Sequence, residues 1–222
     1  MSEQVCISMA QALRDLVPVP NWEELVSFPR RSYPAGVTLL RQGDSGSHVI
    51  AMVSGLVKVV RGGSDGKERL LAFRGPGEVL GEAAVHGGGG RFAHVRTISE
   101  CKASVIPADA FRDFIRRNNL AEELFKCSNS RMCEQVQVCE GGIDQRLAAT
   151  LLRLIKISGA RSLSLTRDEL AQHLGVGRNS VTRALKRFGG DRVRYGRTHI
   201  EVFDEMYLRR LLGHQAGGNG GM

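Results

Sequence analysis

The chain has 222 residues, of which 42% are hydrophobic and 24% charged, a balance typical of a globular protein rather than a disordered one. No apolar run approaches the roughly 18–20 residues of a membrane-spanning helix, and Glu3, Arg14 and Asp15 interrupt the N-terminus where a secretory signal would be apolar. The five cysteines are odd in number and form no Cys-x-x-Cys pair, which argues against a disulfide framework. We therefore expect a soluble, cytoplasmic protein that makes no membrane contact.

The formal charge of +8 is concentrated at one end of the chain. Residues 144–222 hold 14 Lys and Arg against 7 Asp and Glu, whereas the preceding residues hold 17 against 16. A basic domain beside a nearly neutral one is typical of nucleic-acid binding. The charge by itself is equally compatible with a surface that only keeps the protein soluble.

The first half of the chain changes from a helical to a β-rich pattern. Residues 1–28 predict a short helical lead-in around Leu13, which Pro18 and Pro20 should end. Residues 32–107 alternate short β-rich runs with glycine turns. Runs of this length at this spacing predict an antiparallel roll or jelly-roll barrel.

A helix is expected from about Leu120 to Cys139, with a narrow apolar stripe on an otherwise polar surface. The stripe consists of Phe125, Met132, Val136 and Cys139. We expect a second copy of the chain to cover it, although packing against its own domain is the alternative. Gly141 and Gly142 then indicate a hinge. The predicted organisation is an α+β chain divided into a sensor roll (1–115), a dimerisation helix (116–140), a DNA-binding domain (141–214) and a disordered tail (215–222).

The most specific pattern lies at residues 165–188 and predicts a helix-turn-helix. Thr166 and Glu169 form a capping box for the first helix, and Gly175 supplies the turn before the second. The second helix should place its polar residues in the major groove of DNA. The predicted contact residues are Arg178, Asn179, Ser180, Thr182, Arg183 and Lys186.

The residue types suit DNA recognition. Arg178 and Arg183 can each form two hydrogen bonds with guanine, and Asn179 can contact adenine or phosphate. Thr182 can meet a thymine methyl group or a phosphate. Two further cations, Lys186 and Arg187, are expected to bind phosphates. Downstream, two β runs around Gly196 predict a hairpin wing, or else a simple solvated turn, with basic residues facing the DNA backbone: Arg192, Arg194 and Arg197.

The order of a roll, a long helix and a winged helix-turn-helix resembles the Crp/Fnr family of transcription regulators. The resemblance is carried by residues 33–44 (YPAGVTLLRQGD), 53–59 (VSGLVKV), 75–82 (GPGEVLGE), 91–96 (RFAHVR) and the helix-turn-helix. It implies a homodimer that binds palindromic double-stranded DNA and regulates transcription through RNA polymerase. Family members usually carry Glu where this chain has Asn179, and we therefore expect an altered half-site.

The resemblance also implies an effector pocket in the roll, where cyclic-nucleotide-binding members hold ribose with Glu and phosphate with Arg. The matching residues are Gly81, Glu82, Arg91, Phe92 and Ala93. Phe92 replaces a phosphate-binding hydroxyl, and no clear Thr-Ser pair contacts a base, since Arg131 and Met132 fall nearer that position. Cyclic AMP, another small effector, or no effector all remain open, and Glu82 could instead pair with Arg91.

Other chemistries find little support in the sequence. Cys6 stands alone where an iron–sulfur cluster would need several cysteines, and the histidines His48, His86 and His94 show no haem or metal spacing. No catalytic motif occurs, so we expect neither an enzyme nor a metal site. Three alternatives remain: a cyclic-nucleotide-binding module without DNA binding, a constitutive DNA binder with an empty roll, and a redox-sensing roll.

Overall fold

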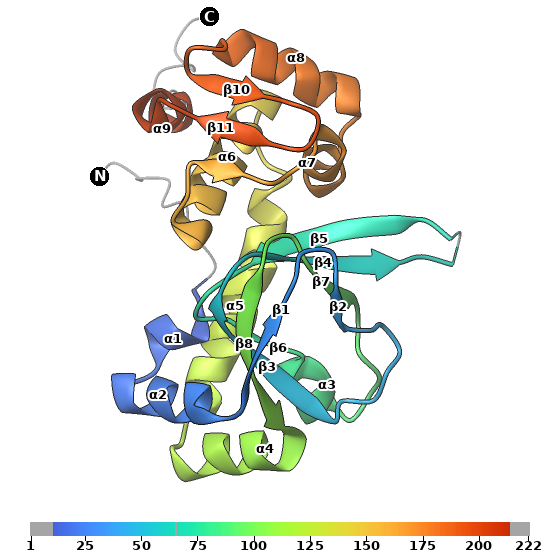
Figure 1. The fold of residues 1–222 in the computed structure, drawn as a ribbon, viewed down its shortest axis with the longest axis vertical. Helices are drawn as coiled ribbons and strands as arrows, with labels where there is room; N and C mark the ends of the chain where they lie inside the picture. Colours follow the sequence, from blue (N-terminus) through green and yellow to red (C-terminus); the bar gives the residue numbers. More distant parts are fainter. Residues whose placement is uncertain (1–10, 65, 214–222) are drawn as a thin grey trace, which may run out of the picture. The chain divides into compact units, whose positions relative to one another are not determined.

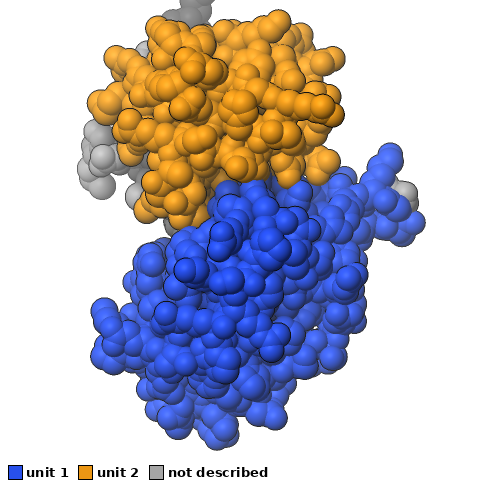
Figure 2. Space-filling view, in the orientation of Figure 1, with its two compact units in different colours: residues 1–137 blue, residues 138–222 orange. Residues whose placement is uncertain are grey.

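The computed structural model describes residues 11–64 and 66–213. The chain divides into two compact units, residues 1–137 and 138–222 (Figure 2), and each is described by itself. The predicted tail at 215–222 and Cys6 lie outside the described residues. Among the residues that are described, no helix combines the length and the apolar character needed to cross a bilayer.

Two four-stranded antiparallel sheets form the roll of the first unit (Figure 1). One sheet has the order β1 (Arg30–Tyr33), β8 (Cys101–Pro107), β3 (His48–Ser54) and β6 (Val79–Leu80). The other has the order β2 (Thr38–Leu40), β7 (His94–Thr97), β4 (Val57–Gly62) and β5 (Glu68–Arg74). Residues of both sheets, among them Leu40, Met52 and Val95, share one buried cluster. The predicted roll is confirmed.

The helical lead-in contains one helix more than was predicted. Two helices are present, α1 (Leu13–Leu16) and α2 (Val19–Ser27). Pro18 caps α2 and Pro20 lies in its first turn, where a missing backbone N–H removes no helical hydrogen bond. The first helix ends at Leu16, before extended Val17 and Pro18, as predicted, and the second helix that begins at the prolines was not predicted.

The described residues of the first unit also form α3 (Glu82–Gly87), α4 (Ala108–Arg117) and α5 (Ala121–Gln137). One side of α5 is buried against the roll through residues that include Cys127 and Glu134. The other side exposes Phe125, Met132 and Val136 by 69, 64 and 56%, respectively. We call these three residues the α5 stripe. Cys139 does not belong to it, because the helix ends at Gln137.

The second unit packs four helices around a small sheet of order β10-β11-β9. In chain order the elements are α6 (Ile143–Ser158), β9 (Ser162–Leu163), α7 (Arg167–Leu174), α8 (Arg178–Phe188), β10 (Val193–Tyr195), β11 (Ile200–Val202) and α9 (Glu205–Gly213). The core-facing side chains of α6, α7 and α8 are leucine-rich, with Leu147, Leu170 and Leu185 fully buried. The antiparallel pair β10–β11 is the predicted wing hairpin.

Candidate functional sites

The helix-turn-helix is built by local interactions between neighbouring residues. The Thr166 hydroxyl accepts a hydrogen bond from the Glu169 backbone N–H at 3.1 Å, and the Glu169 carboxylate accepts one from the Thr166 N–H at 2.9 Å. These two bonds fix the start of α7. Gly175 ends α7 at φ +63°, a left-handed conformation that favours glycine. The chain then turns directly into α8.

Helix α8 separates its apolar and polar residues cleanly. Val181, Ala184, Leu185 and Phe188 are buried. On the opposite side Arg178, Asn179, Arg183 and Lys186 are exposed, whereas Ser180 and Thr182 are half-buried. The side chains that were expected to read DNA are therefore together on one face of the helix.

These polar side chains differ in whether they already have hydrogen-bond or ion-pair partners within the protein. Arg178 lies 3.5 Å from the Asp168 carboxylate in an exposed pair. The Thr182 hydroxyl donates to the Arg178 carbonyl at 3.0 Å, which leaves its methyl group as the more accessible part. Among the described residues, Asn179, Arg183 and Lys186 have no hydrogen-bonding or ion-pair partner. Their hydrogen-bond donors, acceptors and charges are therefore all available to a ligand.

Arg187, which was expected to bind phosphate, already has an acidic partner. Its guanidinium donates two hydrogen bonds to Asp144, at 2.9 and 2.5 Å. This pairing raises the pKa of Arg187 and joins its exposed side chain to α6. A residue with an acidic partner on its own domain is a poorer phosphate contact than Lys186.

The wing arginines also differ from one another. Arg192 donates to the Phe188 carbonyl at 3.2 Å and stacks on the Tyr207 ring at 4.5 Å, so it packs inward. Arg194 lies over the Phe203 ring at 4.8 Å and remains exposed. Arg197, at the turn, is exposed. Arg197 is therefore available to a DNA backbone, Arg194 is exposed but lies 3.9 Å from the Glu201 carboxylate, and Arg192 stabilises the domain.

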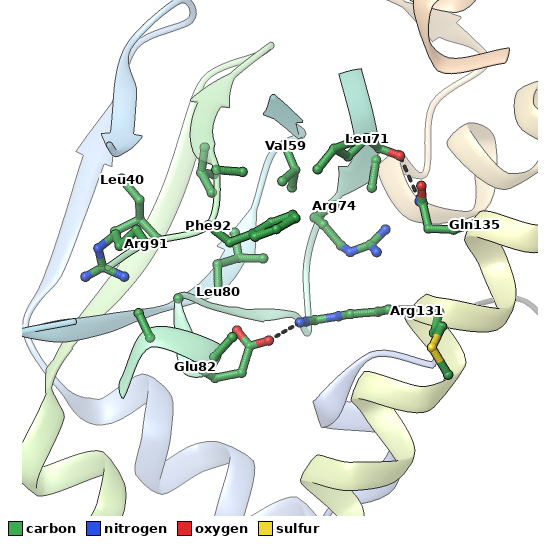
Figure 3. Close-up of a pocket in the computed structure, with 17 residues that line it drawn as sticks. Leu40, Val59, Leu71, Arg74, Leu80, Glu82, Arg91, Phe92, Arg131 and Gln135 are labelled. Atoms are coloured by element: carbon green, nitrogen blue, oxygen red, sulfur yellow. Dashed lines mark hydrogen bonds and ion pairs between the residues drawn. The ribbon is translucent and has the colours of Figure 1, made fainter. Parts of the chain in front are cut away.

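The roll contains a pocket of about 440 Å³, within the size range of small-molecule sites (Figure 3). Its apolar lining includes Leu40, Val59, Leu71, Leu80, Val95 and Met132. All five predicted effector residues line it: Gly81, Glu82, Arg91, Phe92 and Ala93. The structure therefore brings the predicted set together.

Glu82 does not pair with Arg91. Its carboxylate accepts a hydrogen bond from Arg131 of α5 at 2.5 Å (Figure 3). The same guanidinium donates to the Glu78 carboxylate at 2.5 Å and to the Val79 carbonyl at 2.8 Å. The alternative of a Glu82–Arg91 pair was wrong because Arg131 supplies the counter-charge.

Arg91 is 5% exposed and has no carboxylate within ion-pair distance among the described residues. Its Nη2 donates to the His48 carbonyl at 2.7 Å, while its Nη1 is buried and unpartnered. Burial lowers the pKa of Arg91 from its usual value. At Gly81, which has φ +90°, a Cβ would lie 2.2 Å from this Nη1. Glycine is thus required both by the backbone and by the arginine packed against it.

Phe92 forms an open wall of the pocket, with 61% of its surface exposed. The Arg61 guanidinium covers the ring at 3.8 Å from the centroid, a cation–π contact. Ala93 is buried and presents only a methyl group to the lining. Neither side chain offers a hydrogen-bond donor.

A buried ion-pair network beside the pocket was not predicted from the sequence. Arg74 lies 2.9 Å from Glu134 of α5 and 3.5 Å from Glu78, and all three side chains are almost fully buried. Burial lowers the pKa of Arg74 to about 10. The available signal was a pair of opposite charges, Arg74 and Glu78, four residues apart within an apolar stretch.

Residues 11–64 and 66–213 contain no group of three His, Cys, Asp or Glu side chains that could hold a metal ion. Cys101 and Cys127 are buried, whereas Cys133 and Cys139 are exposed. Burial raises the pKa of the Cys127 thiol to about 11. This thiol therefore stays protonated and unreactive at neutral pH.

Residues 30–118 match the cyclic nucleotide-binding domain family, and residues 145–211 match the Crp-like helix-turn-helix domain family. The chain is 30% identical over 171 residues to a CRP-like cAMP-activated global transcriptional regulator of Mycobacterium tuberculosis, covering 70% of this chain and 75% of that protein. It is 29% identical over 190 residues to the cyclic AMP receptor protein of Thermus thermophilus, covering 83% and 88%.

Solved structures show the same fold. A putative cyclic nucleotide binding protein from Ruegeria pomeroyi superimposes with a TM-score of 0.66 at 25% identity, over 89% of this chain and 92% of that one. A CRP/FNR-family regulator from Thermus thermophilus gives 0.65 at 23% identity, over 83% and 98%. The chain therefore belongs to the Crp/Fnr family and is a DNA-binding transcription regulator with a cyclic-nucleotide-binding type of sensor domain.

Proposed function

We propose that this regulator binds a palindromic DNA site as a homodimer and that the pocket of the roll controls its affinity for DNA. The observation that carries the proposal is the polar face of α8, where Asn179, Arg183 and Lys186 have no partner among the described residues. Arginine and asparagine on one exposed helix face match the donor and acceptor pattern of the major groove.

In this proposal the side chains have separate roles. Arg178 and Arg183 read guanine, Asn179 reads its base pair, and the Thr182 methyl group meets a thymine. Ser180 and Lys186 contact phosphates and set the register on the duplex. Arg194 and Arg197 of the wing contact the DNA backbone. RNA polymerase is the further partner that family membership implies.

Dimerisation through the α5 stripe supports the same function. The stripe exposes three large apolar side chains on one face of the helix. Burial of such surface is favourable by about 25 cal/mol per Å² removed from water. A second copy of α5 covers Phe125, Met132 and Val136 with the same residues, as an isologous dimer interface requires. Two recognition helices then bind two half-sites of a palindrome.

The test is binding of the full chain to DNA selected from a random duplex pool, followed by fluorescence anisotropy at several salt concentrations. We expect a palindromic site, two chains per duplex and an affinity that falls as salt rises. Arg178→Ala combined with Arg183→Ala abolishes sequence preference, whereas Arg116→Ala on α4 leaves it intact. Selection of a site without two-fold symmetry, or one chain per duplex, contradicts the proposal.

Control by the pocket is the second half of the proposal. The relatives from Mycobacterium tuberculosis and Thermus thermophilus are named for cyclic AMP, and the matching Glu82 and Arg91 line the pocket here. A ligand that binds one arrangement of the protein more tightly shifts the population and changes DNA affinity. Burial keeps the Cys127 thiol protonated, with a pKa of about 11, so redox sensing would need one of the exposed thiols, Cys133 or Cys139.

A further inference from the structure

Arg91 is a buried cation with unused hydrogen-bonding capacity at the edge of an apolar pocket. It is 5% exposed, its Nη1 has no partner in the described part of the chain, and Glu82, the only carboxylate there that lines the pocket, is bonded to Arg131 at 2.5 Å. Asp44 and Glu82 act on Arg91 only from beyond ion-pair distance, and desolvation outweighs their attraction, since the pKa of Arg91 is lowered. An anionic ligand group at Arg91 would remove this cost.

The other polar side chains of the lining are satisfied within the protein. Gln135 donates to the Leu71 carbonyl at 2.8 Å, and Arg74 donates to the Phe73 carbonyl at 2.8 Å and pairs with Glu134. Arg131 is balanced by two carboxylates, which leaves only its buried Nε for a neutral acceptor. A ligand rich in hydroxyl or amino groups would lose hydrogen bonds to water here, at about 1–3 kcal/mol for each group left unsatisfied.

The rest of the pocket favours an apolar and preferably aromatic body. Leucine, valine, alanine and methionine side chains supply most of the lining. Phe92, which is 61% exposed and has Arg61 at 3.8 Å from its ring centroid, adds an aromatic ring to this lining. Figure 3 shows Phe92 between Arg91 at one end and Arg131 at the other. An aromatic ring in the ligand could stack on or pack against the edge of Phe92, as aromatic pairs do.

We propose that the pocket binds a small organic acid with a single anionic group and an apolar, aromatic body, in preference to a cyclic nucleotide. The inference rests on the proposed function in that the ligand occupies the same control site. Arg91, with its unused N–H, selects an anionic group, and the ring of Phe92 selects an aromatic body. Glu82 is already paired and so is not free to bind a ribose.

The experiment measures binding to the full chain by isothermal titration calorimetry and thermal shift. The test compounds are acetate, phenylacetate, 1-naphthylacetate, the neutral 1-naphthylacetamide and cyclic AMP. We expect affinity to rise with the size of the ring system, since burial of apolar surface drives binding. The amide should bind about tenfold or more weakly than the matching acid, because the charge-assisted hydrogen bond is lost.

Two variants separate this site from nonspecific anion binding. Arg91→Gln should abolish the difference between 1-naphthylacetate and its amide. Arg116→Gln removes one positive charge from the exposed surface of α4 and should leave that difference unchanged. Circular dichroism and the melting temperature of the free Arg91→Gln variant show whether it is folded; if it is not, Phe92→Ala provides the second test, with weaker binding of the aromatic acids expected.

Each result decides the inference. Equal affinities for acid and amide, no binding by any of the acids, or tighter binding of cyclic AMP than of 1-naphthylacetate would overturn it. Tight binding of cyclic AMP would contradict the proposed class of ligand. It would still support the proposal that a ligand in the pocket controls DNA affinity. DNA selection with the free protein tests the proposed DNA binding independently of every compound in the series.

Discussion

Arg131 of α5 joins the pocket to the helix that carries the exposed α5 stripe, since its Nη1 lies 2.5 Å from the Glu82 carboxylate. Glu82 begins α3 at the edge of the pocket, and Met132, the next residue after Arg131, belongs to the stripe. Glu82 is therefore connected to the proposed dimer interface by its ion pair with Arg131 and by the peptide bond from Arg131 to Met132. This contiguity gives the pocket a physical route to α5.

Loss of Arg131 should destabilise the protein strongly. Arg131→Ala leaves the Glu78 and Glu82 carboxylates without their shared counter-charge in a largely buried position. Breaking a buried pair by removal of one partner costs about 3–5 kcal/mol. Urea unfolding followed by circular dichroism measures this loss for the first unit.

The control for that measurement is Arg116→Ala, which breaks an exposed pair with Asp113. Exposed pairs contribute about 0–1 kcal/mol, so this variant should unfold close to the parent protein. Equal losses for the two variants would show that the Glu78–Arg131–Glu82 cluster makes no special contribution.

A charge in the α5 stripe should prevent self-association. Phe125→Glu and Met132→Glu place a carboxylate where the proposed dimer buries apolar surface, and unpaired charge at an interface is strongly unfavourable. Both residues are exposed in the single chain, so the fold of the first unit should be preserved. Sedimentation equilibrium should give a monomer for each variant and a dimer for the parent.

The control replaces an equally exposed residue on another helix. Arg116→Glu, on α4, should remain dimeric. If the stripe variants also remain dimeric, the chains associate through a different surface, and the proposed arrangement of recognition helices fails with it.

Lys186 and Arg183 should affect DNA binding in different ways. Lys186→Ala should weaken binding to all sequences about equally and reduce the slope of log affinity against log salt by about 1. Arg183→Ala should cost about 1–3 kcal/mol and relax the preference at a single base pair. Anisotropy titrations on the selected duplex and on one-base variants distinguish the two patterns, and a base-selective loss from Lys186→Ala would reverse the assignment.

The helix-turn-helix could be predicted because its determinants are neighbours in sequence. Thr166, Glu169 and Gly175 act within a few residues of each other, and the apolar spacing of α8 follows the helical period directly. The roll was similarly signalled by short runs and glycine turns. The place of Pro20 in α2 was missed because a proline in the first turn of a helix and one after its end look alike in sequence.

The partner of Glu82 could not be predicted from the pattern alone. Glu82 and Arg131 are 49 residues apart, and the pairing depends on how α5 lies against the roll. The same holds for Arg74 and Glu134, which are 60 residues apart. Composition and periodicity identify which residues share a face of a helix or strand. The pairing of charges that are distant in sequence depends on tertiary packing.

Asn179 should determine one base pair of the half-site. Its amide donates and accepts, a pattern that suits adenine, whereas a glutamate would accept a hydrogen bond from cytosine N4. Asn179→Glu should therefore move the preference at that position from A·T to a G·C pair, by about 1–3 kcal/mol, while the other positions stay the same. Parallel selections with the two proteins measure the change, and identical half-sites would show that Asn179 does not contact a base.

The cysteines provide a direct test of redox control. Cys133 is exposed on α5, whereas Cys127 is 2% exposed and its pKa is raised to about 11 by burial. Because the thiolate is the reactive form, iodoacetamide at pH 8 should label Cys133 in the folded protein and Cys127 only after unfolding. Peptide mass spectrometry resolves the two sites. Rapid labelling of Cys127 in the folded chain, or loss of DNA binding upon mild oxidation that Cys133→Ser prevents, would instead support a thiol switch on the helix that carries the α5 stripe.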